Sequence, residues 1–490
     1  MLATLAVLAL SAAPRCVEVL SISDLHGRAE ALPRLAAEVE AARAEGDALV
    51  VAAGDVLFGT LEADLTEGRT VAAGLEALGV AAAAVGDQDF DQGSEPLRAR
   101  VAGTRFPWLA ANLKEAGTGA LPRWKNLRSG SIVTMPSGLA VGIVGVSPAQ
   151  GRALVPPGRV WGLEFGEEAP AALVAARTLR RDGADLVLVV AHVGSNCPDG
   201  ARDPAACEDS ALFRLAREAG DEVDGIVAAH TFRAIAMEVG GVPIVQAPGH
   251  GERLARLTLC ERGEDGGGGA PLAGAGGDEP GGVSGGGRPS APPRGALAAS
   301  VAAAVRPYVA LARVEAAKGV GATLGRPLAS VSGGDGSLGV AAAAAVRRSG
   351  QASFGLVPAV EIRADLPAGE VTAGALREAF PAPDRIALAE LEGWQVEALV
   401  RGALPGEVHL AGLRVGADGA VSGCDGAPLE ARRVYRLATS EGAVAGAGVL
   451  ARVVGPLPEA RVELAGRTTR EAVAAWLREA PAGRVAEGCP

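Results

Sequence analysis

The sequence predicts an α/β protein of at least two domains, and three observations support this prediction. Short apolar segments rich in Val, Leu and Ala alternate with helix-like segments between residues 17 and 260, a pattern typical of buried parallel strands. The chain has 490 residues, a length that suits two or three domains. Hydrophobic residues make up 49% of it, which excludes a wholly disordered protein despite 69 Gly and 31 Pro residues.

The first domain is expected to cover residues 16–261. Its predicted strands are the apolar segments 17–22, 48–53, 139–146, 186–191, 225–229 and 254–260, and its predicted helices are 29–43, 71–78, 169–181 and 210–219. This alternation predicts a layered α/β domain whose strands are mostly parallel.

Three further segments complete the predicted organisation. Residues 262–297 are rich in Gly and Pro, which predicts a disordered linker or insertion. Residues 298–318 are rich in Ala and Val and are expected to form one helix. A second domain is expected over 319–490, with strand-like segments at 353–362, 385–393 and 434–440.

The N-terminus predicts export. Residues 1–15 open with the apolar stretch MLATLAVLALSAA, a candidate signal peptide in which Ser11, Ala12 and Ala13 suit a signal peptidase. No Lys or Arg precedes Arg15, so a first buried strand or a misassigned start is the alternative. No later apolar run reaches the ~18 residues of a membrane span, so no transmembrane segment is expected. A periplasmic or secreted location follows from the candidate signal peptide.

Six cysteines in an exported chain are candidates for disulfide formation. Cys197 and Cys207 bracket the turn-rich segment CPDGARDPAAC, where a disulfide would stiffen the loop. Two free thiols on a mobile loop are the alternative. The remaining cysteines have no assignable partner, and none has the C-x-x-C spacing of a structural zinc site; they are Cys16, Cys260, Cys424 and Cys489.

The charge of the chain argues against a nucleic-acid partner. Its formal net charge is −11, whereas binding to phosphate backbones needs a basic face. Aromatic residues make up only 3%, so a stacking platform for bases is also not expected.

Polar side chains follow several predicted strands at the point where each strand ends. Asp24 and His26 follow the first, Asp55 the second, the segment GDQDFD (86–91) comes after residues 81–85, and His192 and His230 follow two later strands. Ligands gather beyond the carboxyl ends of such strands, and Asp and His are common ligands of divalent metals. Each residue alone is more often structural, but three of only five histidines share this placement.

The motifs resemble those of a known family. In order, SDLHG, GDVLFGT, GDQDFDQG, PWLAANL, AHVG and VDGIVAAHTF resemble the calcineurin-like metallophosphoesterases of the 5′-nucleotidase family. VEIRADLPAGEVTAGALREAFP and LAELEGWQVEALV resemble that family's C-terminal substrate-binding domain. The resemblance implies a four-layer αββα domain, a bridging helix and a smaller α/β domain. It also implies hydrolysis of nucleotides or related phosphoesters with divalent metal ions, one or two of Zn, Mn or Co.

Carried over onto this chain, the family's ligands form two groups that share Asp55. One metal would be held by Asp55, Asp87, His192 and His230, and the other by Asp24, His26 and Asp55. The family motif GNHEFD reads GDQDFD here, so Gln88 stands at the catalytic histidine while Asp91 is retained. The motif GHTH reads AHTF, so Phe232 replaces a ligand. His250 is a candidate to fill that space, and a surface histidine is the alternative.

The second domain also departs from the family pattern. The motif NGGGIR reads VPAVEIR, which keeps Ile362 and Arg363 without the glycines. Arg363 is predicted to bind a phosphate or carboxylate, with a solvated arginine as the alternative. The family's base-stacking rings have no counterpart at the expected places in FPAPDR (380–385) and SEGAVAGAG (440–448).

Two functions follow as hypotheses. The first is a metal-dependent phosphoester hydrolase with an eroded or altered active site, acting on a small phosphoester other than an ordinary nucleoside monophosphate. The alternative is a catalytically inactive pseudoenzyme that serves as an exported binding or scaffold protein. The sequence leaves the substrate, the metal and the oligomeric state open.

Overall fold

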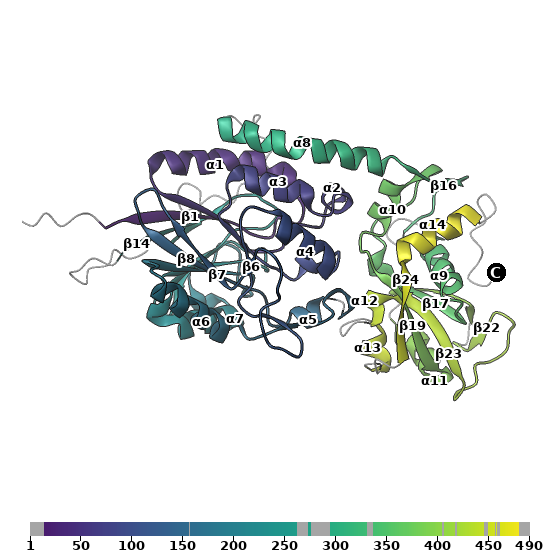
Figure 1. Cartoon of the computed structure of the whole chain (residues 1–490). Helices are drawn as coiled ribbons and strands as arrows, with labels where there is room; N and C mark the ends of the chain where they lie inside the picture. Colours follow the sequence, from purple (N-terminus) through teal and green to yellow (C-terminus); the bar gives the residue numbers. More distant parts are fainter. Residues whose placement is uncertain are drawn as a thin grey trace, which may run out of the picture.

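Two bodies joined by a long helix make up the computed structural model (Figure 1). It describes residues 14–155, 157–261, 273–275, 295–330, 337–403, 406–416, 419–444, 449–455, 457 and 461–479. The candidate cleavage site at residues 11–13, most of the Gly- and Pro-rich segment and Cys489 lie outside these residues.

The N-terminal body contains two large sheets. The first has seven strands in the order β15 (Ala273–Ala275), β14 (Ala255–Cys260), β1 (Cys16–Ile22), β2 (Ala48–Ala52), β3 (Ala82–Ala84), β4 (Trp108–Leu109) and β6 (Leu127–Arg128). The strands from β1 to β6 pair in parallel, and β14 pairs antiparallel with β1. The second has six strands in the order β12 (Ile235–Val239), β13 (Val242–Gln246), β11 (Gly225–Ala228), β10 (Leu186–Ala191), β8 (Ala140–Val146) and β7 (Gly130–Thr134).

Helices cover the outer face of each sheet. The first sheet packs against α1 (Leu32–Glu45), α3 (Arg69–Leu78) and α8 (Ala296–Ala316), and the second against α6 (Glu168–Arg181) and α7 (Ala211–Ala219). Val17 and Val19 of β1 face the second sheet, whereas Leu20 and Ile22 face the helices. Both faces of the strand are therefore buried, which explains its unbroken apolar sequence. The four-layer αββα arrangement that the resemblance implied is present.

Shorter elements complete this body. They are α2 (Leu61–Leu65), α4 (Ser94–Gly103), α5 (Gly151–Leu154) and the pair β5 (Leu113–Glu115) and β9 (Leu163–Phe165). The predicted helix at 29–43 begins as a single 3₁₀ turn, Ala29–Ala31, and continues as α1 with Pro33 in its first turn.

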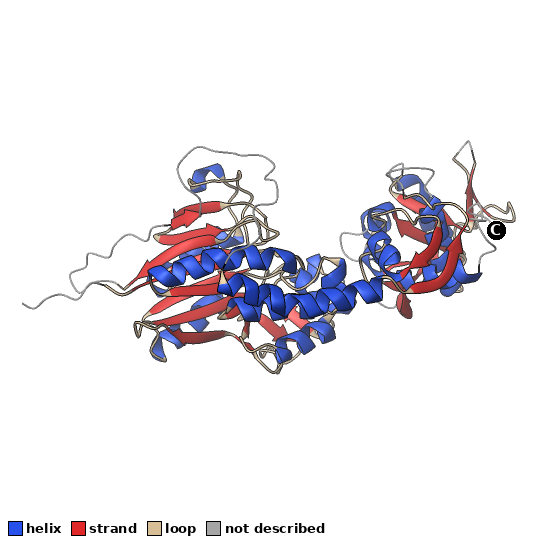
Figure 2. Ribbon diagram, turned by 90° about the horizontal axis from the view of Figure 1, so that it is seen from above, coloured by secondary structure: helices blue, strands red, loops and turns tan. Residues whose placement is uncertain are grey.

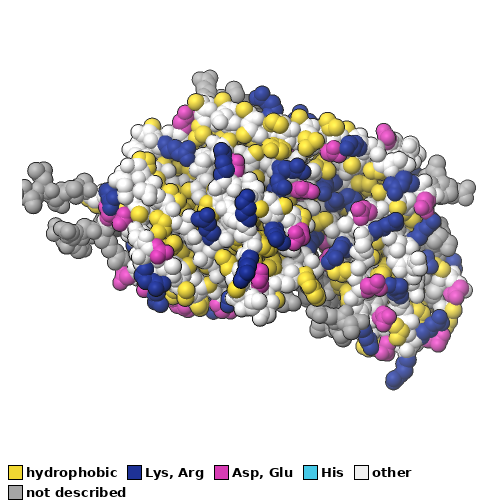
Figure 3. Space-filling model, viewed as in Figure 1, with side chains coloured by type: hydrophobic (Ala, Val, Ile, Leu, Met, Phe, Trp, Pro, Cys, Tyr) yellow, Lys and Arg dark blue, Asp and Glu magenta, His cyan; other side chains and the backbone are white. Residues whose placement is uncertain are grey.

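Helix α8 runs along α1 and α3 and leads into the C-terminal body, as Figures 1 and 2 both show. Ala298, Val301 and Val305 are buried against the first body, while Leu311 and Val314 are 42% and 62% exposed. By length and composition, α8 is the one described helix that could cross a membrane, although it packs here against the first body. On the face drawn in Figure 3, basic and acidic side chains are interspersed over both bodies.

The C-terminal body is a five-stranded sheet flanked by helices. Its strand order is β20 (Val408–Ala411), β17 (Phe354–Pro358), β23 (Val434–Ser440), β19 (Arg385–Glu392) and β24 (Val462–Thr468). The helices are α9 (Ser337–Ser349), α10 (Ala373–Ala379), α11 (Gly393–Gly402), α12 (Glu441–Val444), α13 (Val449–Val454) and α14 (Thr469–Glu479). Two small pairs join β16 (Gly319–Leu324) to β18 (Gly369–Thr372) and β21 (Leu413–Val415) to β22 (Val421–Gly423).

One predicted strand is shorter than expected. The segment 353–362 forms β17 only as far as Pro358, and Ala359–Glu361 is a 3₁₀ turn. Proline has no N–H with which to continue a ladder, so the strand ends there.

Two disulfides are present in the N-terminal body. Cys197 is joined to Cys207, as the loop spacing suggested. Cys16 is joined to Cys260, a pairing that the sequence did not assign, because these residues lie opposite each other only once β1 and β14 pair. Cys424 is also disulfide-bonded.

Candidate metal centre

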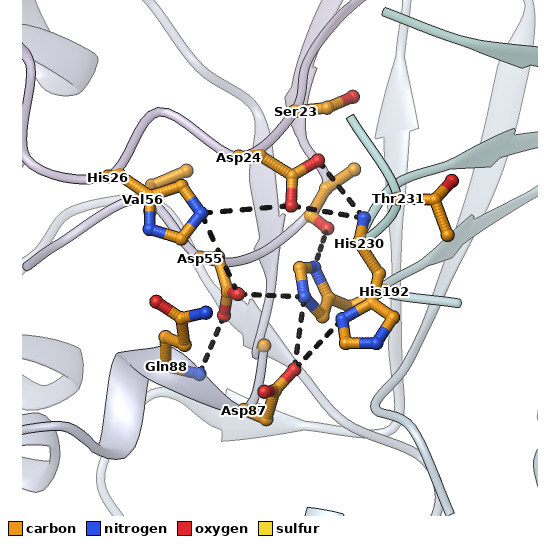
Figure 4. Close-up of polar contacts among 12 residues, drawn as sticks. Ser23, Asp24, His26, Asp55, Val56, Asp87, Gln88, His192, His230 and Thr231 are labelled. Atoms are coloured by element: carbon orange, nitrogen blue, oxygen red, sulfur yellow. Dashed lines mark hydrogen bonds and ion pairs between the residues drawn. The ribbon is translucent and has the colours of Figure 1, made fainter. Parts of the chain in front are cut away.

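The polar clusters that follow separate strands converge at one edge of the N-terminal body (Figure 4). Asp24, Asp55 and Asp87 follow β1, β2 and β3 of the first sheet, and His192 and His230 follow β10 and β11 of the second. The two sheets are stacked face to face with their carboxyl ends on the same side, so residues far apart in sequence meet there.

The larger cluster consists of Asp55, Asp87, His192 and His230, whose ligand atoms all lie within 4.8 Å of one another. Nε2 of His192 lies 3.0 Å from Oδ2 of Asp55 and 3.2 Å from Oδ1 of Asp87. Nδ1 of His230 lies 3.3 Å from the same Asp87 oxygen. Two imidazoles and two carboxylates at these separations suit one divalent ion.

A second cluster contains Asp24, His26 and Asp55. Nε2 of His26 lies 4.0 Å from Oδ1 of Asp24 and 4.0 Å from Oδ2 of Asp55. Asp55 is therefore common to both clusters, and in Figure 4 it lies between the His26 side and the His192 side. A shared carboxylate of this kind suits a pair of ions a few ångströms apart.

The backbone at this centre is strained. Asp24, His26, Asp55 and His230 all have positive φ, between 46° and 83°. Residues other than glycine seldom adopt this conformation, which costs of order 1 kcal/mol each and concentrates at functional sites. All four residues supply ligand atoms to one or both of the two clusters.

A residue that the sequence did not assign holds this backbone in place. Asp89 is fully buried, and its carboxylate accepts four backbone N–H groups at 3.0 Å: those of Asp55, Val56, Leu57 and Gly86. The loop after β2 and the loop after β3 are thus tied to one carboxylate. Nothing in the sequence distinguishes Asp89 from its neighbours in GDQDFD, because its role depends on which loop lies beside it.

The chemistry of the donor atoms fits a bound cation. Nδ1 of His192 lies 2.8 Å from the carbonyl oxygen of Ala53, which can only accept, so Nδ1 carries the proton. Nε2 faces the carboxylates of Asp55 and Asp87, makes no hydrogen bond in this structure, and would offer its lone pair to a bound cation. Oδ1 of Asp87 and Nε2 of His26 are buried without a hydrogen-bond partner as well. One cation in each cluster would satisfy all three: the first ion would contact His192 and Asp87, and the second His26.

The pKa shifts of the buried acidic residues and of His26 also indicate a bound cation. Burial raises the pKa of Asp24 and of Asp55 to about 6 each. Burial acts to raise the pKa of Asp87 too, but His192 and His230 lower it overall. Burial and the neighbouring His250 and His192 lower the pKa of His26 to about 4. Negative charge is thus costly here without a cation to balance it.

The substituted catalytic position faces a cleft between the two bodies. The side chain of Gln88 is exposed there, and its backbone N–H donates to Oδ1 of Asp55 at 2.8 Å. Oδ1 of Asp91 lies 3.3 Å from Nη1 of Arg159, whose Nη2 also contacts Asp384 of the C-terminal body. Sequence reasoning missed Arg159 and Asp384, because each acquires its role only from a residue of the other body.

Phe232 occupies the place next to His26 where the family has a ligand. The two rings stack with centroids 5.1 Å apart. His250 lies edge-on to His26, with ring centroids 5.6 Å apart, and is not among the residues whose ligand atoms converge. Its backbone N–H donates to the carbonyl of Asp24 at 2.7 Å. The two ligand clusters thus do not include His250, and its replacement of the missing ligand stays a prediction.

The cleft has a volume of about 600 Å³ and is lined by both bodies. Arg363 contributes to its wall, together with the segment 381–383. Phe380, the ring next to this segment, is only 3% exposed and packs in the core of the C-terminal body. The structure thus places Arg363 at the cleft and turns Phe380 away from it.

Each of the two bodies matches a known protein family. The family model of calcineurin-like phosphoesterases matches residues 17–233, and that of the 5′-nucleotidase C-terminal domain matches residues 314–453. Among curated proteins, the endonuclease YhcR of Bacillus subtilis is 26% identical over 277 residues, 50% of this chain and 22% of its own length. The 5′-nucleotidase of Vibrio cholerae is 28% identical over 215 residues, 44% of this chain and 37% of its own. The chain thus matches well under half of each relative.

Solved structures share the fold. A 5′-nucleotidase precursor from Thermus thermophilus superimposes with a TM-score of 0.60 at 20% identity, covering 97% of this chain and 99% of that one. A 5′-nucleotidase from Candida albicans superimposes with a TM-score of 0.54 at 10% identity, covering 94% and 98%. These similarities show the fold, and the two family models, which together span most of the chain, show that it belongs to the calcineurin-like phosphoesterases of the 5′-nucleotidase family.

Proposed function

We propose that this protein hydrolyses a small phosphoester with the help of one or two divalent metal ions. The observation that carries the proposal is the pair of ligand clusters sharing Asp55, with orphaned buried donor atoms, beside a cleft that both bodies line. In the reaction, water attacks phosphorus and the P–O bond to the alcohol breaks. Inorganic phosphate and the alcohol are released, and the leaving oxygen must gain a proton.

The proposed ligands are Asp55, Asp87, His192 and His230 for one ion, and Asp24, His26 and Asp55 for the other. When bound, such ions supply Lewis-acid stabilisation of phosphoryl oxygens and a nucleophile at neutral pH. The chain itself fixes the ligand geometry through Asp89 and the Ala53 carbonyl. Arg363, on the opposite wall of the cleft, is proposed to bind the substrate.

The step for which this site lacks the family's catalytic group is proton transfer to the leaving oxygen. Gln88 cannot give or take a proton, and Asp91 faces Arg159 instead of an imidazole. Loss of a general acid typically costs about 10²–10⁴ in rate. We therefore propose an altered site that hydrolyses esters of acidic alcohols, such as p-nitrophenyl phosphate, far better than alkyl phosphates.

A catalytically inactive pseudoenzyme that binds or scaffolds is the second candidate. Gln88 stands where the family has a catalytic histidine, and Phe232 stands where it has a metal ligand. Asp91, at a position that the family uses in catalysis, is paired with Arg159 instead. These observations favour binding without turnover. Survival of both ligand clusters favours the hydrolase.

One set of measurements separates the two. Metal content per chain is determined, and hydrolysis of p-nitrophenyl phosphate is then followed with added Mn²⁺, Co²⁺ or Zn²⁺. The hydrolase hypothesis expects activity that disappears in Asp55→Ala and rises steeply in the double variant Gln88→His with Phe232→His. Activity that survives Asp55→Ala reports a contaminant, and bound metal without hydrolysis even in the double variant supports the pseudoenzyme.

We also propose that the protein is exported. The disulfides Cys16–Cys260 and Cys197–Cys207 support this, because disulfides persist in oxidising compartments such as the periplasm. Fractionation of cells that produce the full-length protein tests it, together with alkylation of the unreduced protein read by mass spectrometry: protein confined to the cytoplasm, with reactive thiols at these four positions, would contradict export.

A further inference from the structure

The cleft beside the metal centre has an uneven charge distribution. Two of its acidic residues are already balanced by arginines: Asp91 faces Arg159, and Oδ2 of Asp64 lies 3.9 Å from Nη1 of Arg377. Arg159 in turn contacts Asp384, so its charge is fully compensated. Asp64, Asp91 and Arg159 line the cleft, and because each is paired they leave little net charge on its wall.

Two other arginines of the cleft are not compensated. Arg28 follows the His26 loop of the N-terminal body, and Arg363 follows the 3₁₀ turn after β17 of the C-terminal body. Both side chains are exposed, and within the described residues neither has an ion pair or a side-chain hydrogen bond. The cleft thus presents one free guanidinium from each body, beside a metal centre that takes a phosphoryl group.

Among the described residues that line this cleft, the only rings are the imidazoles of His26 and His250, which pack against each other and against Phe232. The segment 381–383 forms the wall instead. Its position is fixed by the guanidinium of Arg470, which donates to the carbonyls of Phe380, Pro381 and Ala382 at 2.6–3.2 Å. These bonds fix the backbone of the segment, while the ring of Phe380 is buried in the core of the C-terminal body and does not reach the cleft.

We infer that the substrate of this site is a phosphoester without a nucleobase that carries a second anionic group, a carboxylate or a second phosphate. This inference rests on the proposed function. The metal centre and one arginine suffice for the phosphoryl group that is cleaved, and the other guanidinium then pairs with the second anion across the cleft. A nucleoside monophosphate would leave that arginine unpaired and would find no free ring on which to stack its base.

The test compares substrates that differ by one group. Full-length protein with the metal that best supports p-nitrophenyl phosphate hydrolysis is assayed on glycerol 3-phosphate, 3-phosphoglycerate, propane-1,3-diyl bisphosphate and AMP. 3-Phosphoglycerate differs from glycerol 3-phosphate by a carboxylate in place of a hydroxymethyl group. We expect at least about 10-fold higher kcat/KM for whichever anionic compound, carboxylate or bisphosphate, matches the cleft, the factor that about 1.4 kcal/mol supplies. AMP is expected to be the poorest of the four.

Variants assign the effect to the arginines. Arg28→Gln or Arg363→Gln should reduce the preference for the second anion by raising KM, whereas Arg306→Gln, on the exposed side of α8, should leave the preference unchanged. Circular dichroism checks that each variant is folded. Equal kcat/KM for glycerol 3-phosphate and both anionic compounds, or AMP as the best substrate, would overturn the inference while the hydrolase function stands.

Failure of the hydrolase function gives a different pattern. In that case no phosphoester is cleaved, p-nitrophenyl phosphate included, although metal is bound. Ligand-induced shifts of Tm then test the cleft directly: 3-phosphoglycerate or the bisphosphate should stabilise the wild type more than glycerol 3-phosphate does, and Arg28→Gln should abolish the difference. Equal shifts would overturn the inference on its own.

Discussion

Removal of the Asp89 carboxylate tests whether one buried acid organises the metal centre. In Asp89→Ala, four buried backbone N–H groups lose their acceptor: those of Asp55, Val56, Leu57 and Gly86. An unsatisfied buried donor costs about 1–3 kcal/mol, so the low end of the range for four donors is about 4 kcal/mol. For a domain of this size that corresponds to a Tm lowered by about 8–16 °C.

The conservative variant gives a second, smaller magnitude. Oδ1 accepts from Val56 and Leu57, and Oδ2 from Asp55 and Gly86. In Asp89→Asn one of these oxygens becomes an NH₂ group, so two donors lose their partner and face another donor. About half the loss of the alanine variant is expected.

Differential scanning calorimetry of the metal-free protein measures the decrease in Tm of the N-terminal body in both variants. The control is Asp182→Ala, an exposed position on the same body. A Tm for Asp89→Ala within about 2 °C of the control would refute the reasoning, since it would mean that water or a neighbouring group replaces the carboxylate at no cost.

Three further predictions concern the metal ligands, pH and the contact between the bodies. A methyl group on Gly54, where φ is +91°, would lie 2.5 Å from Nδ1 of His192 and displace that ring. Gly54→Ala should therefore weaken Zn²⁺ binding, measured by calorimetric titration, by about 10–100-fold. The control Gly183→Ala, at φ +98° with open space around it, should leave Zn²⁺ binding unchanged. Burial raises the pKa of Glu361 to about 8, so the folded state holds a proton that the unfolded state releases above its ordinary pKa of ~4.3. Stability of the C-terminal body should therefore fall as pH rises from about 5 to about 8, and Glu361→Gln should flatten that slope in thermal melts; parallel slopes would contradict the assignment. Arg159→Ala removes the ion pair with Asp384 that joins the two bodies. The bodies should then separate more easily, and the radius of gyration measured by X-ray scattering should increase. Arg177→Ala, whose ion pair with Glu222 lies within one body, should leave the radius of gyration unchanged.

The strands of the fold were well predicted from the sequence, and the reason is burial on both faces. The predicted segment 186–191 coincides with β10, and 17–22, 139–146 and 254–260 differ from β1, β8 and β14 by one residue at one end. Such runs of Val, Leu and Ala are unambiguous because neither face tolerates polar residues. The segment 353–362 was harder, since its apolar pattern continues beyond the residue where Pro358 ends the ladder.

The candidate ligands could also be chosen from the sequence, since Asp and His residues at strand ends are few and the chain has only five histidines. The structure brings all six together, but their mutual distances and the sharing of Asp55 depend on how two sheets stack. His250 shows the limit of sequence reasoning: its ring lies beside that of His26, but the sequence could not say whether it joins the ligand atoms, and the two clusters do not include it.

By itself the sequence determined the α/β class, the family resemblance, the candidate ligands and the two substituted positions, Gln88 and Phe232. All of these depend on local patterns, which are readable along the chain. Only the tertiary structure decided that Cys16 pairs with Cys260, that Asp89 ties two loops together and that Arg159 bridges to the second body. The contacts between these separate segments join residues 32 to 244 positions apart, and nothing in the local sequence of either partner specifies the other.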